Sequence, residues 1–306
     1  MKTKITKDHQ IHTPVLLREV LSYLQPSQGQ SLLDLTAGYG GHCSEILKRT
    51  LSYEDTILID RDQTAIDYLV NKFGGKNVKI IKDDYLSAST KLFQAQKKFD
   101  LILADLGVSS EHFDNKERGF SFMEDAPLDM RMDQSADLTA FDIVNSYKEE
   151  KIVKILKEYG EEKYAKRIAN RIVVNRPIKS TLELAGLIES AVPSRGRKKI
   201  NPATKTFQAL RIAVNDEVES LKKSLPIWLE LLNPEGRIVV ISFHSIEDRI
   251  VKKFFNVEGK SGYESRLEIL TKKPITASPH ELDLNPRARS AKLRAAVKIK
   301  KQEGAS

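Results

Sequence analysis

Three glycines and two carboxylates are the residues whose types and spacing could do chemistry together. Gly38, Gly40 and Gly41 follow a short apolar run. Glycines at such a point let the backbone turn sharply and approach a ligand closely. Asp60 lies 22 positions past Gly38, the spacing at which a carboxylate accepts hydrogen bonds from ribose hydroxyls. Because Asp105 ends a further apolar run, the pattern predicts a site for a nucleotide-type cofactor.

The acidic residues help to distinguish between two kinds of cofactor. A dinucleotide site favours Gly-x-Gly-x-x-Gly, but the third glycine position is Cys43. Asp83 and Asp84 follow another apolar run, and carboxylates at successive strand ends would repel a pyrophosphate. They suit a cationic ligand with hydroxyls and an amine, such as S-adenosylmethionine. A cluster of turn glycines beside solvated acids is the alternative without a ligand.

The segments that must position these residues alternate between short apolar runs and amphipathic stretches. Runs at residues 31–35, 56–60, 78–81 and 99–106 predict buried strands. Helical spacing is expected between them, at residues 43–49 and 63–73. A further strand is expected at 237–243 after a turn at 233–236, followed by a helix at 246–255 and a final pair of strands at 266–271 and 293–300. This alternation predicts βαβ units in a doubly wound α/β sheet.

The middle of the chain has a different, helical pattern. Helices are expected at 148–158, 161–175 and 181–191, and the last opens with a capping box at Ser180. A long helix is expected at 203–232, interrupted near Pro226 because proline lacks an amide proton. We therefore predict a discontinuous α/β domain at residues 1–112 and 208–306, with an inserted helical domain at residues 113–207.

The composition excludes several classes of protein. The chain has 306 residues, of which 40% are hydrophobic and 30% charged, as in globular domains. No apolar run approaches the roughly 20 residues that cross a bilayer. The N-terminal segment has no apolar core of a secretion signal, and one cysteine cannot form an internal disulfide. We expect a cytoplasmic protein, and the net charge of +8 favours a polyanionic partner.

Ordered motifs along nearly the whole chain resemble the bacterial family of small-subunit ribosomal RNA cytosine N4-methyltransferases of the H type, also called MraW. The motifs are His12-Thr13-Pro14-Val15-Leu16, Gly40-Gly41-His42, Asp60-Arg61-Asp62, Asp105-Leu106-Gly107-Val108-Ser109-Ser110, Glu117-Arg118-Gly119-Phe120-Ser121-Phe122, Pro127-Leu128-Asp129-Met130-Arg131-Met132-Asp133, Tyr159-Gly160-Glu161-Glu162, Ser242-Phe243-His244-Ser245 and Asn285-Pro286-Arg287-Ala288-Arg289-Ser290. Two departures stand beside them: Tyr39 replaces a frequent arginine and Cys43 a common serine.

The resemblance implies a fold, a reaction and a set of contacts. The fold would be a Rossmann-like, class I S-adenosylmethionine-dependent methyltransferase domain with an inserted all-helical domain for substrate recognition. The reaction would be methylation of a cytosine N4 amine in the decoding region, at the P site, of 16S ribosomal RNA within the small ribosomal subunit. A homodimer is one possible assembly, and no membrane partner is expected. The implied cofactor contacts are Gly40, Gly41, His42, Asp60, Tyr85, Asp105 and His112.

Each implied contact also has a structural alternative. Asp60 could cap a helix, although Asp62 could do so instead. Tyr85 offers an aromatic face for adenine or ordinary packing, and His42 could cap a helix or fill the core. Asp105 is the expected catalytic residue, because a cytosine amine is a poor nucleophile and needs an oriented acceptor for its N–H bonds. The sequence does not identify the final proton acceptor.

The expected RNA contacts are arginines in three segments. They are Arg118 and Arg131 after the Asp105 strand, Arg197 in a basic loop, and Arg287, Arg289 and Arg294 near the C-terminus. Arg118 and Arg131 could instead pair with Glu117 and Asp129. Phe120, Phe122, Met130 and Met132 could wall in a flipped base or pack between domains. His244 could line the substrate cleft or be structural, and no ligand cluster indicates a metal.

Two other functions remain as alternatives. A nicotinamide-dependent oxidoreductase would use a similar glycine loop, although the missing third glycine and the acids at the strand ends argue against it. A non-catalytic RNA-binding or assembly factor could retain the fold. The intact glycine loop, Asp60 and Asp105 favour an enzyme.

Overall fold

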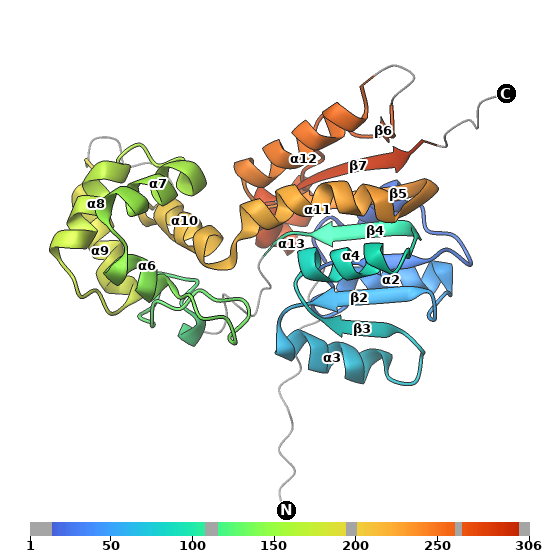
Figure 1. Ribbon diagram of the computed structural model, residues 1–306, viewed down its shortest axis with the longest axis horizontal. Helices are drawn as coiled ribbons and strands as arrows, with labels where there is room; N and C mark the ends of the chain where they lie inside the picture. Colours follow the sequence, from blue (N-terminus) through green and yellow to red (C-terminus); the bar gives the residue numbers. More distant parts are fainter. Residues whose placement is uncertain (1–13, 108–115, 194–200, 261–264, 300–306) are drawn as a thin grey trace, which may run out of the picture. The chain divides into compact units, whose positions relative to one another are not determined.

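The structure is a computed structural model that describes residues 14–107, 116–193, 201–260 and 265–299. The chain divides into two compact units (Figure 1). Met1–Gly107 and Lys222–Ser306 form a sheet unit, and Val108–Leu221 form a helical unit. An α/β domain with a helical insertion is therefore the architecture, as the sequence predicted.

A seven-stranded sheet forms the centre of the sheet unit, in the order β3-β2-β1-β4-β5-β7-β6. The strands are β1 (Leu32–Asp34), β2 (Thr56–Asp60), β3 (Lys79–Lys82), β4 (Phe99–Asp105), β5 (Leu232–Ser242), β6 (Leu267–Ile269) and β7 (Lys292–Lys298). The first five strands of this order are parallel, and β7 runs antiparallel to both β5 and β6. The expected doubly wound, Rossmann-like fold is confirmed.

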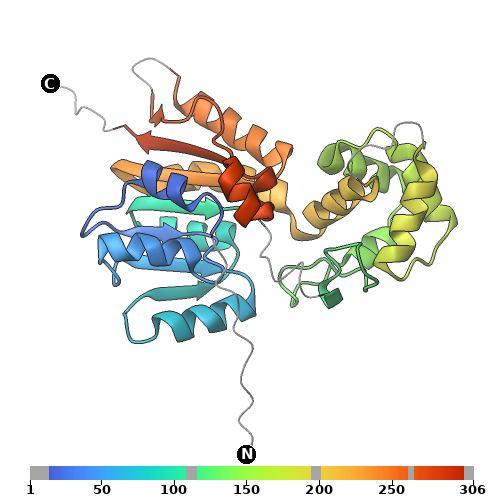
Figure 2. The ribbon, with the colours of Figure 1, turned by 180° about the vertical axis from the view of Figure 1, so that it is seen from behind.

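Helices cover both faces of this sheet (Figures 1 and 2). They are α1 (Leu17–Leu24), α2 (Gly41–Thr50), α3 (Gln63–Phe73), α4 (Tyr85–Gln94), α11 (Glu217–Leu231), α12 (Ser245–Glu258), α13 (Pro279–Leu284) and the 3₁₀ helix η2 (Pro286–Ser290). Apolar residues of α1, α2 and α3 share one core with Leu101 and Leu103 of β4. Because side chains alternate along a strand, Ile102 and Ala104 face the opposite side. Tyr85 of α4 meets Trp228 of α11 edge to face at 5.6 Å.

The predicted turn at residues 233–236 lies inside β5 as an irregularity. Leu232 pairs with Phe99 of β4, but the next pair along the ladder joins Arg237 to Leu101. The extra residues loop out between these pairs, and Glu235 takes a φ of 65° there. The turn-forming residues therefore form a bulge within one long strand.

In the described part of the helical unit, five α-helices surround the core. They are α6 (Ala140–Ser146), α7 (Glu149–Gly160), α8 (Ala165–Val174), α9 (Thr181–Ala191) and α10 (Ala203–Asn215), preceded by the 3₁₀ helix η1 (Lys116–Arg118). The predicted cap of α9 is confirmed, because the Ser180 hydroxyl accepts a hydrogen bond from the Glu183 amide. Phe120, Met130 and Met132 are buried in this same core. Their partners in this core are the helices of their own unit, so packing within the helical unit is the role that the structure shows.

The position of the break in the long predicted helix was wrong. Pro226 lies inside α11, and the chain breaks ten residues earlier at Asp216, whose φ is 49°. Proline removes one hydrogen bond, whereas a left-handed residue ends the helix outright. The end of the helical unit also differs from the predicted 207, because the buried face of α10 belongs to the helical core. Among the described residues, no helix is long and apolar enough to cross a membrane.

Candidate functional site

The glycine loop joins the end of β1 to the start of α2 and needs glycine at two places. Gly40 is the N-cap of α2 with a φ of 70°, a left-handed conformation that side chains rarely adopt. At Gly41, a Cβ atom would lie 2.6 Å from Cγ of Pro14. At Gly40 a Cβ atom would also lie 3.0 Å from Cδ2 of Leu69, so both glycines allow neighbouring side chains to pack closely against the loop.

Lys72 of α3 holds this loop from outside. Its Nζ donates hydrogen bonds to the carbonyl oxygens of Tyr39 and Gly40, each at 3.0 Å. The amine also lies 5.6 Å from the ring centroid of Tyr68, and that ring packs edge to face against Tyr39 at 5.2 Å. Burial lowers the pKa of Lys72 below its ordinary value. The tyrosine that departs from the family pattern is thus part of a local cluster that fixes the loop.

Asp60 at the end of β2 faces the glycine loop. One carboxylate oxygen accepts from the Gly38 amide at 2.8 Å and the other from the Asp62 amide at 2.9 Å. Asp62 caps α3 by accepting from Thr64, so Asp60 is not the helix cap. Burial raises the pKa of Asp60, while the two amide hydrogen bonds oppose that rise. Each oxygen retains a second lone pair, which is the acceptor capacity that a ribose diol requires.

His42, Asp105 and Asp34 form a buried polar group at the carboxyl end of β1 and β4. Nε2 of His42 lies 3.6 Å from Oδ2 of Asp105, and the histidine is 7% exposed. Within the described residues, neither ring nitrogen of His42 has a hydrogen-bond partner, and Oδ1 of Asp105 has none either. The Asp105 amide donates to the Thr36 hydroxyl at 2.6 Å. Buried polar atoms without partners are costly, so this group indicates a ligand position.

Asp34 is the third member of the group and is 1% exposed. Burial raises the pKa of Asp34 to about 7, partly opposed by the nearby His42 and by a hydrogen bond from the Thr36 amide. The sequence analysis did not single out this residue, although it ends the strand that leads into the glycine loop. The position at the carboxyl end of a central strand was the available signal.

Three residues after β3 have structural partners. Asp84 caps α4 by accepting from the Leu86 and Ser87 amides, and Asp83 pairs with Lys91 at 2.7 Å. Tyr85 is 9% exposed and packs against Trp228. Asp83 and Asp84, which favoured a cationic ligand in the sequence, therefore have partners within the protein. Tyr85 has the packing role that was its alternative, and its contact with adenine stays a prediction.

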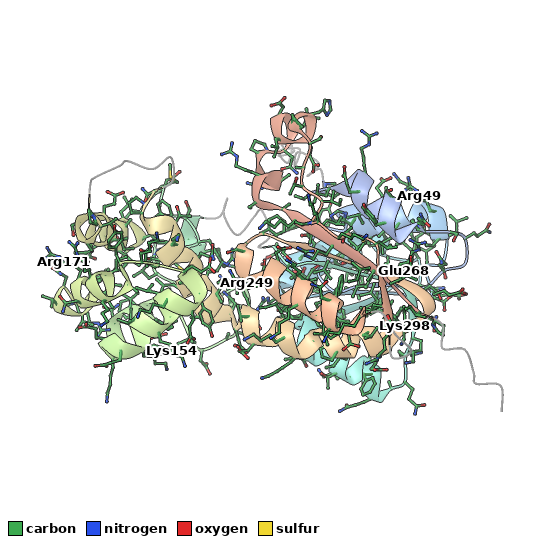
Figure 3. The ribbon with its side chains drawn as sticks, turned by 90° about the horizontal axis from the view of Figure 1, so that it is seen from above. Arg49, Lys154, Arg171, Arg249, Glu268 and Lys298 are labelled. Carbon is green, nitrogen blue, oxygen red and sulfur yellow. The ribbon has the colours of Figure 1, made fainter. Side chains whose placement is uncertain are left out.

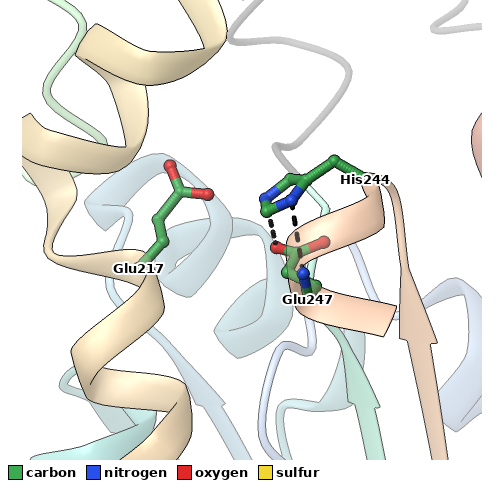
Figure 4. Close-up of side chains that lie close together, drawn as sticks. All are labelled: Glu217, His244 and Glu247. Atoms are coloured by element: carbon green, nitrogen blue, oxygen red, sulfur yellow. Dashed lines mark hydrogen bonds and ion pairs between the residues drawn. The ribbon is translucent and has the colours of Figure 1, made fainter. Parts of the chain in front are cut away.

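The loop after β5 lies beside the end of β4. A Cβ atom at Gly107 would lie 2.6 Å from the ring of Phe243, so these two segments are in close contact. His244 caps α12 by accepting a hydrogen bond from the Glu247 amide at its Nδ1 (Figure 4). In return, the Glu247 carboxylate accepts from the Phe243 amide at 2.8 Å and lies 3.2 Å from Nε2 of His244. The structural alternative for His244 therefore agrees with its geometry.

Two of the arginines expected to contact RNA are engaged within the helical unit. Arg118 is 7% exposed and donates to the carbonyl oxygens of Arg131 and Met132. Arg131 forms a two-pronged ion pair with Asp129, both N···O distances being 2.8 Å. Burial alone would raise the pKa of Asp129, but the hydrogen bonds from Arg131 outweigh it and lower the pKa. These guanidinium groups order the chain after η1, and their contact with RNA stays a prediction.

The C-terminal arginines differ from one another. Arg294 is 5% exposed and its Nε lies 2.7 Å from Oδ1 of Asp248, so it forms an interior ion pair, and its contact with phosphate stays a prediction. Arg287 and Arg289 in η2 are exposed, as a surface contact requires. His112 and Arg197 lie outside the described residues.

The comparisons with known proteins agree with the motifs. The MraW methylase family model matches residues 9–299. A protein from Halothermothrix orenii named ribosomal RNA small subunit methyltransferase H is 44% identical, over 94% of this chain and 98% of the relative. A protein of the same name from Caldicellulosiruptor saccharolyticus is 46% identical, over 94% and 99%. An rRNA methylase structure from Streptococcus thermophilus is 8% identical with a TM-score of 0.43, over 97% of this chain and 100% of that one. The chain belongs to the MraW methylase family.

Proposed function

We propose that this protein is an S-adenosylmethionine-dependent methyltransferase that acts on 16S ribosomal RNA of the small subunit. The acceptor would be the exocyclic N4 amine of one cytosine in the decoding region, at the P site. The relatives named above are small-subunit ribosomal RNA methyltransferases, which supports the substrate. Membership of a methylase family supports methyl transfer over hydride transfer or a purely structural role. A cytoplasmic location and a homodimer stay predictions.

The observation that supports the cofactor most strongly is the set of buried polar atoms without partners. His42 and Asp105 offer an imidazole and a carboxylate oxygen at the strand ends. The glycine loop lies beside them, and at Gly38 of this loop the space that a Cβ atom would take is open. S-adenosylmethionine has an α-amino group, a sulfonium and a ribose, which fit carboxylate and imidazole acceptors. When bound, it supplies an electrophilic methyl group.

The chain's own residues then have distinct tasks. Asp60 would accept hydrogen bonds from the ribose hydroxyls while its bonds to the loop amides keep its carboxylate in place. Asp105 would accept an N–H hydrogen bond from the cytosine amine, which turns the nitrogen lone pair toward the methyl donor. As the new N–C bond forms, the bond between the methyl carbon and the sulfonium sulfur would break with its electron pair left on sulfur. The amine then becomes acidic, and one of its protons would pass to solvent. An oriented carboxylate stabilises the positive charge that develops on the nitrogen.

Mass mapping of modified nucleosides tests this proposal. Small subunits from cells that lack the protein are incubated with the purified protein and S-adenosylmethionine carrying a deuterated methyl group. We expect one labelled N4-methylcytosine in 16S RNA. Labelling at carbon 5, at another base or in no RNA would contradict the proposal, and NADH-dependent activity would restore the oxidoreductase alternative.

Asp105→Asn tests the role of the carboxylate. We expect kcat to fall by about 100-fold or more, because removing one oriented group from a reaction centre typically has this effect. Asp283→Asn, an exposed position without a side-chain contact in the described structure, is the control. An Asp105→Asn variant with normal kcat and an unchanged melting temperature would remove Asp105 from the reaction.

A further inference from the structure

Four exposed cations lie on and just before α8, in a part of the helical unit that the sequence analysis did not single out. Lys163, Lys166, Arg167 and Arg171 are all exposed. Within the described residues, none of their side chains forms a hydrogen bond or an ion pair. Figure 3 shows Arg171 projecting outward from its helix. These four residues are called the α8 row below.

The charge in this stretch has one sign. Six cations and no acids occur from Lys163 to Lys179. The preceding helix, α7, differs because its lysines alternate with Glu149, Glu150 and Glu158. Positive charge is therefore more concentrated in the α8 row than on α7, where acids lie among the lysines.

The buried face of α8 determines which way the side chains of the α8 row point. Ala165, Ile168, Ala169 and Ile172 are buried in the core of the helical unit. Since residues three and four apart share a helix face, this apolar stripe requires the cations to point into solvent. The apolar face is covered by the unit's own helices, so α8 cannot insert that face into a lipid surface in the manner of an interfacial helix.

Local stability does not explain the cations. Arg167 and Arg171 are four residues apart, and like charges at that spacing destabilise a helix. Lys166 and Arg167 occupy the first turn of α8, where the positive end of the helix dipole disfavours cations, and that turn contains no acid. Arg171 lies in the last turn, where the dipole favours a cation. The dipole therefore opposes only Lys166 and Arg167, and the four cations together raise the positive potential at one place. An anionic partner would relieve both effects.

We propose that the α8 row is a docking surface for the phosphate backbone of the RNA substrate. Guanidinium and ammonium groups free of protein partners are the groups that bind phosphates by charge-assisted hydrogen bonds. The row contacts no base, so it adds affinity and orientation without selecting the sequence. This inference rests on the proposed function for the identity of the polyanion, and it adds a second surface to the exposed Arg287 and Arg289.

Salt-dependent RNA binding tests the row with a charge-matched control. The test variant is Lys166→Gln with Arg167→Gln, and the control is Lys154→Gln with Lys157→Gln on α7, which removes two exposed charges from the same unit. Binding of transcribed 16S RNA is measured across a series of KCl concentrations. If two phosphate contacts are lost, the slope of log affinity against log salt becomes shallower by about 1.4 to 1.8. The control should retain the wild-type slope.

Kinetics and stability complete the test. The test variant should raise the KM for RNA roughly tenfold with unchanged kcat, as expected when uniform binding is lost. Its melting temperature should not fall, because the variant relieves the repulsion between Arg167 and Arg171 and removes two cations from the first turn of α8. Equal slopes in the test and control variants would overturn the inference, as would loss of binding to phosphatidylglycerol vesicles with RNA binding unchanged. If the wild type methylates no RNA while its salt slope still depends on α8, the proposed function fails and the docking surface stands.

Discussion

At the residue scale, the buried carboxyl group of Asp34 makes the stability of the fold depend on pH. Its pKa is raised from 3.8 to about 7, so the folded state holds a proton up to about pH 7, whereas the unfolded state releases it near pH 4. The free energy of unfolding therefore falls as pH rises through this window. Between pH 5 and pH 8, the loss attributable to Asp34 is roughly 2 to 3 kcal/mol.

Asp34→Asn should remove this part of the pH dependence. The asparagine keeps an oxygen for the Thr36 amide, and urea unfolding of both proteins at pH 5 and pH 8 gives the difference. The variant should gain stability relative to the wild type at pH 8, and Asp283→Asn should not. Parallel stability curves for Asp34→Asn and the wild type would show that the buried carboxyl does not titrate in this range.

Lys72 is a second residue whose role can be measured, because it holds the glycine loop through two hydrogen bonds. Lys72→Met removes both hydrogen bonds to the loop carbonyl groups at Tyr39 and Gly40. A loosened loop should raise the KM for S-adenosylmethionine by about three- to tenfold, since each lost hydrogen bond costs about 1 kcal/mol. Lys97→Met is an exposed control before β4. An unchanged KM in Lys72→Met would show that the loop keeps its conformation without the lysine.

At the element scale, His244 begins α12 as its cap. His244→Ala should lower the free energy of unfolding by about 1 kcal/mol, the usual cost of losing a cap. His244→Asn should recover most of that stability, because the asparagine oxygen can accept from the Glu247 amide. Thermal unfolding of the three proteins measures both effects. Equal stabilities would mean that the histidine does not stabilise the helix start.

The elements also show what the sequence could predict. Local signals placed β1, β2, α3 and the cap of α9 correctly, because apolar periodicity and capping residues act over a few positions. The helix break at Asp216 was missed because an aspartate in the left-handed region has no strong sequence signal, whereas Pro226 has one. The α8 row was not predicted, because only the folded structure shows which cations form hydrogen bonds or ion pairs and which do not.

The candidate site, like the fold, could be predicted only in part from the sequence. The glycines and Asp60 follow from local spacing, and their geometry agrees with a ligand loop. The burial of Arg294 against Asp248 was not predictable, because the acid comes from a helix 46 residues away in the sequence. The burial of Asp34 was likewise not predictable, because it depends on the neighbouring strands.

At the scale of the whole molecule, ligand binding and folding of the sheet unit are coupled. A ligand that binds only the folded state adds about 2.7 kcal/mol to the free energy of unfolding at 100 times its Kd. S-adenosylmethionine should therefore raise the temperature at which the sheet unit unfolds, while NADH at equal concentration should not. Differential scanning calorimetry measures this shift. A shift with NADH alone would contradict the cofactor assignment.

Calorimetric titration of the full chain with S-adenosylmethionine tests the cofactor site most directly. We expect one bound molecule per chain. Asp60→Ala should reduce the affinity at least tenfold, with a melting temperature that still shows a folded protein. Absence of binding to the wild type, or equal affinity in the wild type and Asp60→Ala, would contradict this expectation.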